Sequence, residues 1–239
     1  MERGIGNVQG LDNFLTSFFS LEVISGKKVR IPYWRNRLSL GGLRRIQGLF
    51  GGKGTPLQIK RATVEKAEKS STNLKKLSSD QIRKFMRQKR IGLDCSGFAF
   101  QILNFLFPEF WRGLKMAPGK STNPIRRFNA YALTSKENST GIDKVKNLKP
   151  GDLISFSWQG KIDHVLTVVK VSENVIVYAH SSEKTKITGP HLGKIKIVDP
   201  EKGLDKQMWL ERDRDGTLIS KYLVSSQARR IKVDKDRGR

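Results

Sequence analysis

The chain has 239 residues, of which 37% are hydrophobic and 28% charged, and 46 lysines and arginines against 22 acidic residues give it a net charge of +24. These proportions exclude a disordered or collagen-like chain, and the lack of 18 uninterrupted apolar residues predicts no transmembrane segment. The single cysteine excludes an intrachain disulfide. The charge favours a polyanionic partner such as nucleic acid, anionic lipid or an acidic cell-wall polymer, bound through a basic surface.

The first strongly apolar stretch is NFLTSFFSLEVI, at positions 13–24. We expect it to form an amphipathic helix or a buried strand. No basic segment precedes it and no small-residue cleavage pattern follows, so we identify no clear signal peptide. The expected location is the cytoplasm, or the cell wall after export by a non-classical route.

Two basic amphipathic helices are predicted between Pro56 and Arg90, after a glycine-rich and basic stretch at 41–60 that is typical of a loop or a short helix between loops. Pro56 suits a first helical turn, and the second helix has three candidate caps and an apolar face. The caps are Ser78, Ser79 and Asp80, and the face is Ile82, Phe85 and Met86. Within the glycine-rich stretch, GLFGGKGT lacks the first glycine and the Ser or Thr of a phosphate-binding loop, so no nucleotide is expected there.

A buried helix is predicted to begin at Cys95 and to end before Pro108, because the segment CSGFAFQILNFLF is almost wholly apolar. Asp94 is a good N-cap residue, which would place Cys95 in the first turn, where backbone N–H groups and the helix dipole stabilise a thiolate. Gly97 would let another segment approach the helix closely. The helix alone leaves two interpretations open: a reactive thiol or an inert core cysteine.

From residue 150 onward the pattern is that of short strands separated by turn residues. The predicted strands are DLISFSW, DHVLTVVKV, NVIVYAH, KIKIVD, QMWLERD and TLISKYLV. Helices followed by strands indicate an α+β fold. We expect a basic helical extension or insertion at 1–90 that packs on a catalytic core at 91–225, and a charged, disordered tail at 226–239.

The chain has three histidines, and two of them lie at the ends of adjacent predicted strands. His164 opens one strand and His180 closes the next, so a hairpin about the intervening SEN turn would bring them together. A cysteine nucleophile needs an imidazole base, which in turn needs a third group to fix its tautomer. His191, in the segment GPHLGK, is expected in a loop and is a reserve candidate for the third group.

The motifs LDCSGFAFQIL, LKPGDLISFSW, DHVLTVVKV and VIVYAHSS together resemble those of the NlpC/P60 family of papain-like cysteine peptidases. The resemblance implies an antiparallel sheet packed against a buried helix that starts at the cysteine. It implies Cys95 as nucleophile, His164 as general base and His180 as the residue that orients the base. Asp94 and Ser96 would bind a substrate amine, and Tyr33, some 60 residues upstream of the cysteine, is a candidate pocket tyrosine. Pro150, Gly151 and Asp152 match a structural turn.

The function that this resemblance implies is hydrolysis of peptide amides, with peptidoglycan stem peptides or another peptide as substrate, through a Cys-His-His triad and a thioester. The alternatives are a basic nucleic-acid-binding or interaction protein on the same scaffold, and an acyltransferase that uses the same cysteine and histidines. No cofactor and no metal are expected, since one cysteine and three scattered histidines match no zinc spacing. The segment ERDRDG, at 211–216, is better explained as an Asp-Gly hairpin turn than as a calcium loop.

Overall fold

The computed structural model describes residues 10–35, 37–38, 45–46, 48–118, 121–158, 161–219 and 226–233. The α-helices are α1 (Leu11–Phe19), α2 (Pro56–Lys69), α3 (Ser79–Gln88), α4 (Cys95–Leu106) and α5 (Ala130–Thr134). The short strands β1 (Leu21–Ile24), β2 (Lys27–Val29), β3 (Arg37–Leu38) and β4 (Arg45–Ile46) form two separate two-stranded pairs. No helix in the described part of the chain is both long and apolar enough to cross a membrane.

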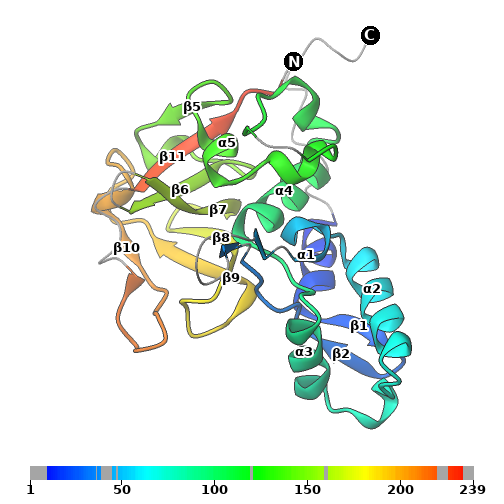
Figure 1. Cartoon of the computed structure of the whole chain (residues 1–239). Coiled ribbons are helices and arrows are strands. Elements are labelled where there is room, and N and C mark those ends of the chain that lie inside the picture. Colours follow the sequence, from blue (N-terminus) through cyan, green and yellow to red (C-terminus); the bar gives the residue numbers. More distant parts are fainter. Residues whose placement is uncertain are drawn as a thin grey trace.

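The other strands form one seven-stranded antiparallel sheet in the order β10-β9-β8-β7-β6-β11-β5. They are β5 (Ser139–Ile142), β6 (Leu153–Trp158), β7 (Lys161–Val171), β8 (Val175–Ser182), β9 (Gly189–Lys196), β10 (Met208–Trp209) and β11 (Ser226–Ile231). Figure 1 shows α4 and α5 against this sheet, and the smaller group of α1, α2, α3, β1 and β2 beside α4. The α+β prediction is confirmed, and the arrangement is compatible with a papain-like fold.

Helix α4 lies between two hydrophobic cores, which explains why almost every position in it is apolar. Phe98, Ile102 and Leu106 pack into the core shared with the N-terminal helices, whereas Ala99 and Leu103 pack with Cys95 into the core shared with α5 and the sheet. Positions three or four apart share a helix face, so each core takes one stripe of the helix. The N-terminus of α4 is therefore held rigidly by packing on both sides.

Three segments of the N-terminal region adopt structures that their local sequence predicts. The apolar stretch at 13–24 is helical up to Phe19 and continues as strand β1, so both predicted structures occur in succession. Helices α2 and α3 both begin with a capping box, in which Thr55 pairs with Gln58 and Ser78 pairs with Gln81. These reciprocal bonds satisfy amide groups that the first helical turn leaves unpaired.

The segment predicted to be a charged, disordered tail is in part an interior strand of the sheet, so that prediction is wrong for residues 226–231. Strand β11 pairs with β5 on one side and β6 on the other. Both of its arginines have partners in the fold: Arg229 donates to Oγ and the carbonyl oxygen of Ser139, and Arg230 forms a bidentate ion pair with Asp152. Residues 234–239 of the tail, and most of the predicted strand at 217–224, lie outside the described residues.

The turn before β6 has the conformation that its Pro-Gly-Asp sequence predicts. Gly151 has a φ of 92°, which a residue with a side chain rarely adopts. Asp152 is 1% exposed, and its Oδ2 accepts a hydrogen bond from the backbone N–H of Lys149. The same carboxylate binds Arg230, so this turn joins the start of β6 to β11.

Candidate active site

Cys95 is the first residue of α4, and Asp94 caps the helix, as the sequence predicts. The Oδ1 atom of Asp94 accepts a hydrogen bond from the backbone N–H of Gly97 at 2.5 Å. A Cβ atom on Gly97 would lie 2.0 Å from the carbonyl oxygen of Gly52, so glycine is required there for the 48–55 segment to pack on the helix. The expected close approach at Gly97 is thereby confirmed.

The Cys95 thiol is buried, with 8% of the residue exposed. Burial raises the pKa of the thiol to about 12, and the nearby Asp94 carboxylate adds to the rise. The backbone N–H groups of Val165 and Ser96 and the Lys53 ammonium act in the opposite direction. The contact with Val165 places the sulfur beside β7, next to the position of His164. In this arrangement the thiol is protonated at neutral pH.

Lys53 is a buried cation beside the cysteine that sequence reasoning did not assign to the site. Its Nζ atom lies 2.7 Å from Oγ of Ser96 and 3.3 Å from Oδ1 of Asp94, and its side chain is only 3% exposed. The Lys53 ammonium thus binds Asp94 and Ser96, the two side chains that the family resemblance predicted to bind the amine of a substrate. The glycine-rich sequence around Lys53 indicated only a phosphate-binding loop, whose pattern it does not match.

His164 and His180 meet as the predicted hairpin requires. His164 is on β7 and His180 on β8, and Nε2 of His164 lies 2.8 Å from Nδ1 of His180. Burial lowers the pKa of both imidazoles, and for His164 the neighbouring His180 adds to this effect. The two rings are therefore neutral at neutral pH, and one N–H joins them.

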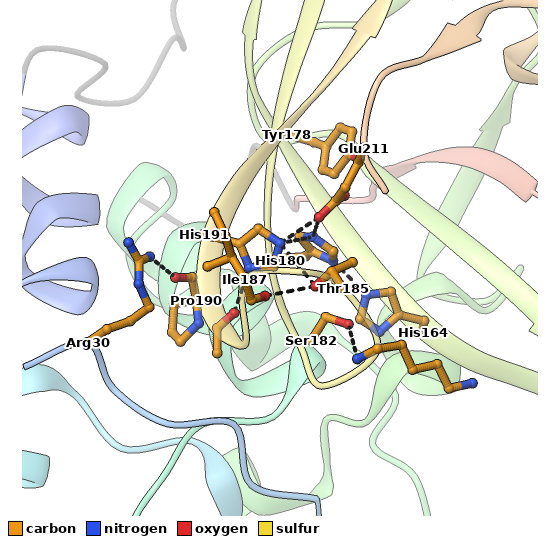
Figure 2. Close-up of polar contacts among 12 residues, drawn as sticks. Arg30, His164, Tyr178, His180, Ser182, Thr185, Ile187, Pro190, His191 and Glu211 are labelled. Carbon is orange, nitrogen blue, oxygen red and sulfur yellow. Dashed lines mark hydrogen bonds and ion pairs between the residues drawn. The ribbon is translucent and has the colours of Figure 1, made fainter. Parts of the chain in front are cut away.

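Beyond His180 the hydrogen bonds continue to Glu211, which follows β10 and which sequence reasoning missed. Its Oε1 atom lies 3.0 Å from Nε2 of His180 and 2.6 Å from Nε2 of His191, and its Oε2 atom accepts from the Tyr178 hydroxyl at 2.5 Å. Figure 2 shows His180 between His164 and Glu211. His191 is in strand β9 and 3% exposed, so its assignment to a loop is wrong.

The charge on Glu211 fixes the positions of the ring protons. Burial raises the pKa of this carboxyl group, but its hydrogen bonds with His180 and His191 outweigh burial and lower the pKa below its usual value. An ionised carboxylate only accepts, so His180 must donate from Nε2 and accept at Nδ1. His164 must then donate from Nε2, which leaves its Nδ1 with a lone pair. That is the tautomer a general base requires.

Cys95 and His164 border two neighbouring cavities. The cavity beside Cys95 has a volume of about 830 Å³, and the one beside His164 and His180 about 110 Å³. Tyr33, Arg35 and Asp163 line both cavities. Among the residues that the structure describes, no hydrogen bond joins the sulfur to His164, whose Nδ1 makes no hydrogen bond there either. Catalytic hydrogen bonds often form only when a substrate is bound.

Tyr33 reaches this region although it lies far upstream in the sequence. Its backbone forms an isolated parallel bridge with Leu93, two residues before the cysteine. Burial raises the pKa of the Tyr33 hydroxyl, and the proximity of Cys95 and Asp94 adds to the rise. The predicted tyrosine is therefore placed beside the candidate nucleophile, by a pairing of backbones that no local sequence pattern indicates.

The residues here that could hold a metal ion are His180, His191 and Glu211. Their Nε2, Nε2 and Oε1 atoms lie within 3.0 Å of one another. Imidazole nitrogen and carboxylate oxygen are both common ligands of divalent transition metals. Sequence spacing gave no indication of this group, because its members come from β8, β9 and the segment after β10.

The α+β fold and the cysteine at the start of a helix beside sheet histidines are compatible with a papain-like architecture. The model of a family described as "Putative amidase domain" matches residues 65–192, which is more than half of the chain. The chain belongs to this amidase family, which indicates an amide hydrolase. The matched region includes Cys95, His164 and His180, but not Lys53 or Glu211. No curated protein and no solved structure matches the chain.

Proposed function

We propose that this amidase is a cysteine amidohydrolase that cleaves peptide amides, with peptidoglycan stem peptides as its substrate. The observation that carries this proposal is the chain of hydrogen bonds from His164 through His180 to Glu211, beside the helix start that presents Cys95. This chain supports a base with its lone pair on Nδ1. The amidase family membership agrees with amide hydrolysis, and the motifs shared with NlpC/P60 peptidases favour a thiol mechanism.

In the proposed reaction Nδ1 of His164 takes the thiol proton as the sulfur of Cys95 attacks the amide carbonyl carbon. The oxyanion that forms accepts from the Cys95 backbone N–H, which is in the first turn of α4 and aligned with the helix dipole. The imidazolium then returns the proton to the departing amine, and a thioester remains. Water, activated by His164, attacks the thioester, releases the carboxylic acid and restores the thiol.

The resting pair in this mechanism is a neutral thiol and a neutral imidazole. Burial disfavours both charged forms, since it raises the pKa of Cys95 and lowers that of His164. Proton transfer must therefore accompany the attack on the substrate. The hydrogen bond from the Cys95 thiol to Nδ1 of His164 would form only when substrate is bound in the cleft. In the free enzyme the thiol would therefore stay protonated and react slowly with small electrophiles.

The basic surface of helices α2 and α3 favours a polyanionic partner for the enzyme. Helices α2 and α3 expose many basic side chains on the faces that do not pack into the core. These residues are Arg61, Lys66, Lys69, Lys84 and Arg87. An acidic cell-wall polymer would be attracted to such a face, and the attraction would weaken with added salt. This surface is the proposed site of contact with the wall.

The proposal is tested by incubating the protein with soluble peptidoglycan fragments and measuring product masses. Cleavage of an amide adds one water, so the two products together weigh about 18 Da more than the substrate. We expect such products from the wild type and none from Cys95→Ala, which keeps the helix cap. Products formed equally by both proteins, or an intact substrate with the wild type, would refute the proposal. Addition of amine acceptors distinguishes hydrolysis from acyl transfer.

A further inference from the structure

We propose that His180, His191 and Glu211 form a binding site for a divalent transition-metal ion, and that the bound ion inhibits the amidase. The metal-binding part stands independently, whereas the inhibition rests on the proposed function. The three candidate ligands meet at one point: Nε2 of His180 is 2.9 Å from Nε2 of His191, and these atoms are 3.0 Å and 2.6 Å from Oε1 of Glu211.

These separations fit a single ion. Zn²⁺ binds imidazole nitrogen and carboxylate oxygen at about 2.0 to 2.2 Å, and a point at that distance from all three atoms exists because each pair is no more than 3.0 Å apart. The ligands then occupy one face of the ion, as in two-histidine, one-carboxylate sites. The opposite face is left for water or other ligands.

Each ligand is also held by a partner on its other polar atom. Nδ1 of His191 lies 2.7 Å from the carbonyl oxygen of Gly189, and Oε2 of Glu211 accepts from Tyr178. Nδ1 of His180 lies 2.8 Å from Nε2 of His164. Such outer partners orient the ligands of metal sites and increase affinity. Figure 2 shows His180, His191 and Glu211 converging, with Tyr178 next to Glu211 and His164 next to His180.

The ligands are buried, and one of them, His180, lines a cavity. His180 is 2% exposed and His191 3% exposed. The cavity of about 110 Å³ beside His164 is lined by His180 and by Thr185, whose Oγ1 lies 3.3 Å from Nε2 of His191. In the proposal the ion enters from this cavity, on the side of His180, and water in the cavity completes its coordination.

Inhibition follows from the placement of ring protons. When the ion takes the lone pair on Nε2 of His180, the ring proton of His180 resides on Nδ1 and donates to Nε2 of His164. The proton of His164 must then move to its own Nδ1, the atom that would accept from Cys95. Neither of these two rings gains or loses a proton, and any proton on Nε2 of His191 is released to solvent, but the lone pair needed for the base on His164 is lost. Metal binding and catalysis are thus mutually exclusive at this site.

Binding is tested on the Cys95→Ala protein, which removes the thiol as a competing ligand, by titration with Zn²⁺ and by the visible absorption of Co²⁺. We expect one ion to bind per chain. His191→Gln and Glu211→Gln should each lower the affinity by more than about 100-fold, which exceeds the loss expected when only a residue that orients a ligand is removed. Glu201→Gln, a change in an exposed ion pair, is the matched control. Equal Zn²⁺ affinity in all four proteins would overturn the site.

Inhibition is tested with Cys95 present, on a peptide substrate that the wild type hydrolyses. We expect Zn²⁺ to abolish hydrolysis and a chelator to restore it, with at least about tenfold more Zn²⁺ needed in His191→Gln relative to that variant's own metal-free rate. If the same Zn²⁺ concentration inhibited the wild type and His191→Gln, the inhibiting ion would be bound to Cys95 instead, and the proposed inhibition through the His180 site would be overturned. If no substrate is hydrolysed, the proposed function fails while the titration still decides the metal site.

Discussion

Nε2 of His164 lies 2.8 Å from Nδ1 of His180, although the two residues are 16 positions apart in the chain. The β7–β8 pairing produces this contact, since it places the start of one strand beside the end of the next. On the far side of His180, Glu211 accepts a hydrogen bond at 3.0 Å. The result is a set of ring protons whose positions all depend on one carboxylate.

Glu211 is therefore expected to act as a positioning residue. Glu211→Gln should lower kcat by about 10- to 100-fold with little change in KM, because an amide can donate as well as accept and no longer fixes the His180 tautomer. Glu211→Asp should recover part of the loss. Nitrogen NMR of the three histidines in metal-free protein reads the tautomers directly.

The control for this substitution is Glu201→Gln, which removes an exposed pair with Lys144 and Lys146. It should change neither kcat nor the histidine spectra. If Glu211→Gln lowered only thermal stability and left the histidine tautomers and kcat unaltered, the carboxylate would have a structural role alone.

Lys53 and Asp94 are expected to be energetically coupled, because they form a largely buried ion pair next to Cys95. Lys53→Met leaves the Asp94 carboxylate without its partner and should lower the free energy of unfolding by about 3 kcal/mol. In the double variant with Asp94→Asn much of this cost should be recovered. Urea unfolding of the four proteins measures the coupling, and strictly additive effects would argue against it.

The reactivity of Cys95 should report its protonation in the free enzyme. The pKa of the thiol is raised to about 12, so thiolate is scarce at neutral pH and increases about tenfold per pH unit below that value. Alkylation by iodoacetamide should be slow at pH 7 and still rising at pH 10. Glutathione, alkylated in parallel, should level off earlier. A plateau for Cys95 near pH 8 would show that its thiol ionises as an ordinary one.

Arg230 tests the place of β11 in the sheet. Arg230→Met removes the bidentate partner of Asp152, a carboxylate only 1% exposed. We expect a loss of about 2 to 3 kcal/mol in the free energy of unfolding, since an unpaired buried charge is costly. Arg112→Met, in an exposed pair with Glu109, should cost about 1 kcal/mol or less. Equal losses would mean that β11 contributes little to stability.

Much of the fold was predictable because its signals are local. The capping boxes of α2 and α3, the cap at Asp94 and the apolar length of α4 lie in short continuous segments. Strand β11 was missed because its arginines read as a solvated tail, whereas their partners, Ser139 and Asp152, lie about 80 to 90 residues earlier in the chain. Strand β5 was missed for a related reason, since its short STGI sequence gains its structure by pairing with β11.

The site shows the same division between local and distant information. Cys95 begins a recognisable helix, and His164 and His180 lie in adjacent predicted strands, so the hairpin pattern was enough to bring the two histidines together. Lys53 and Glu211 lie in segments that contact the site only through the tertiary fold. Lys53 pairs with Asp94 at the start of α4, and Glu211 hydrogen-bonds to the histidines. A single sequence contains no signal that predicts these pairings.

The measurement that tests the central claim most directly is capture of the acyl-enzyme by hydroxylamine during hydrolysis of a peptidoglycan fragment. A thioester on Cys95 should transfer its acyl group to hydroxylamine, giving a hydroxamate about 15 Da heavier than the acid product, in proportion to the hydroxylamine added. We predict this product with the wild type and its absence with Cys95→Ala. Acid as the sole product at every hydroxylamine concentration, formed equally by Cys95→Ala, would contradict the account.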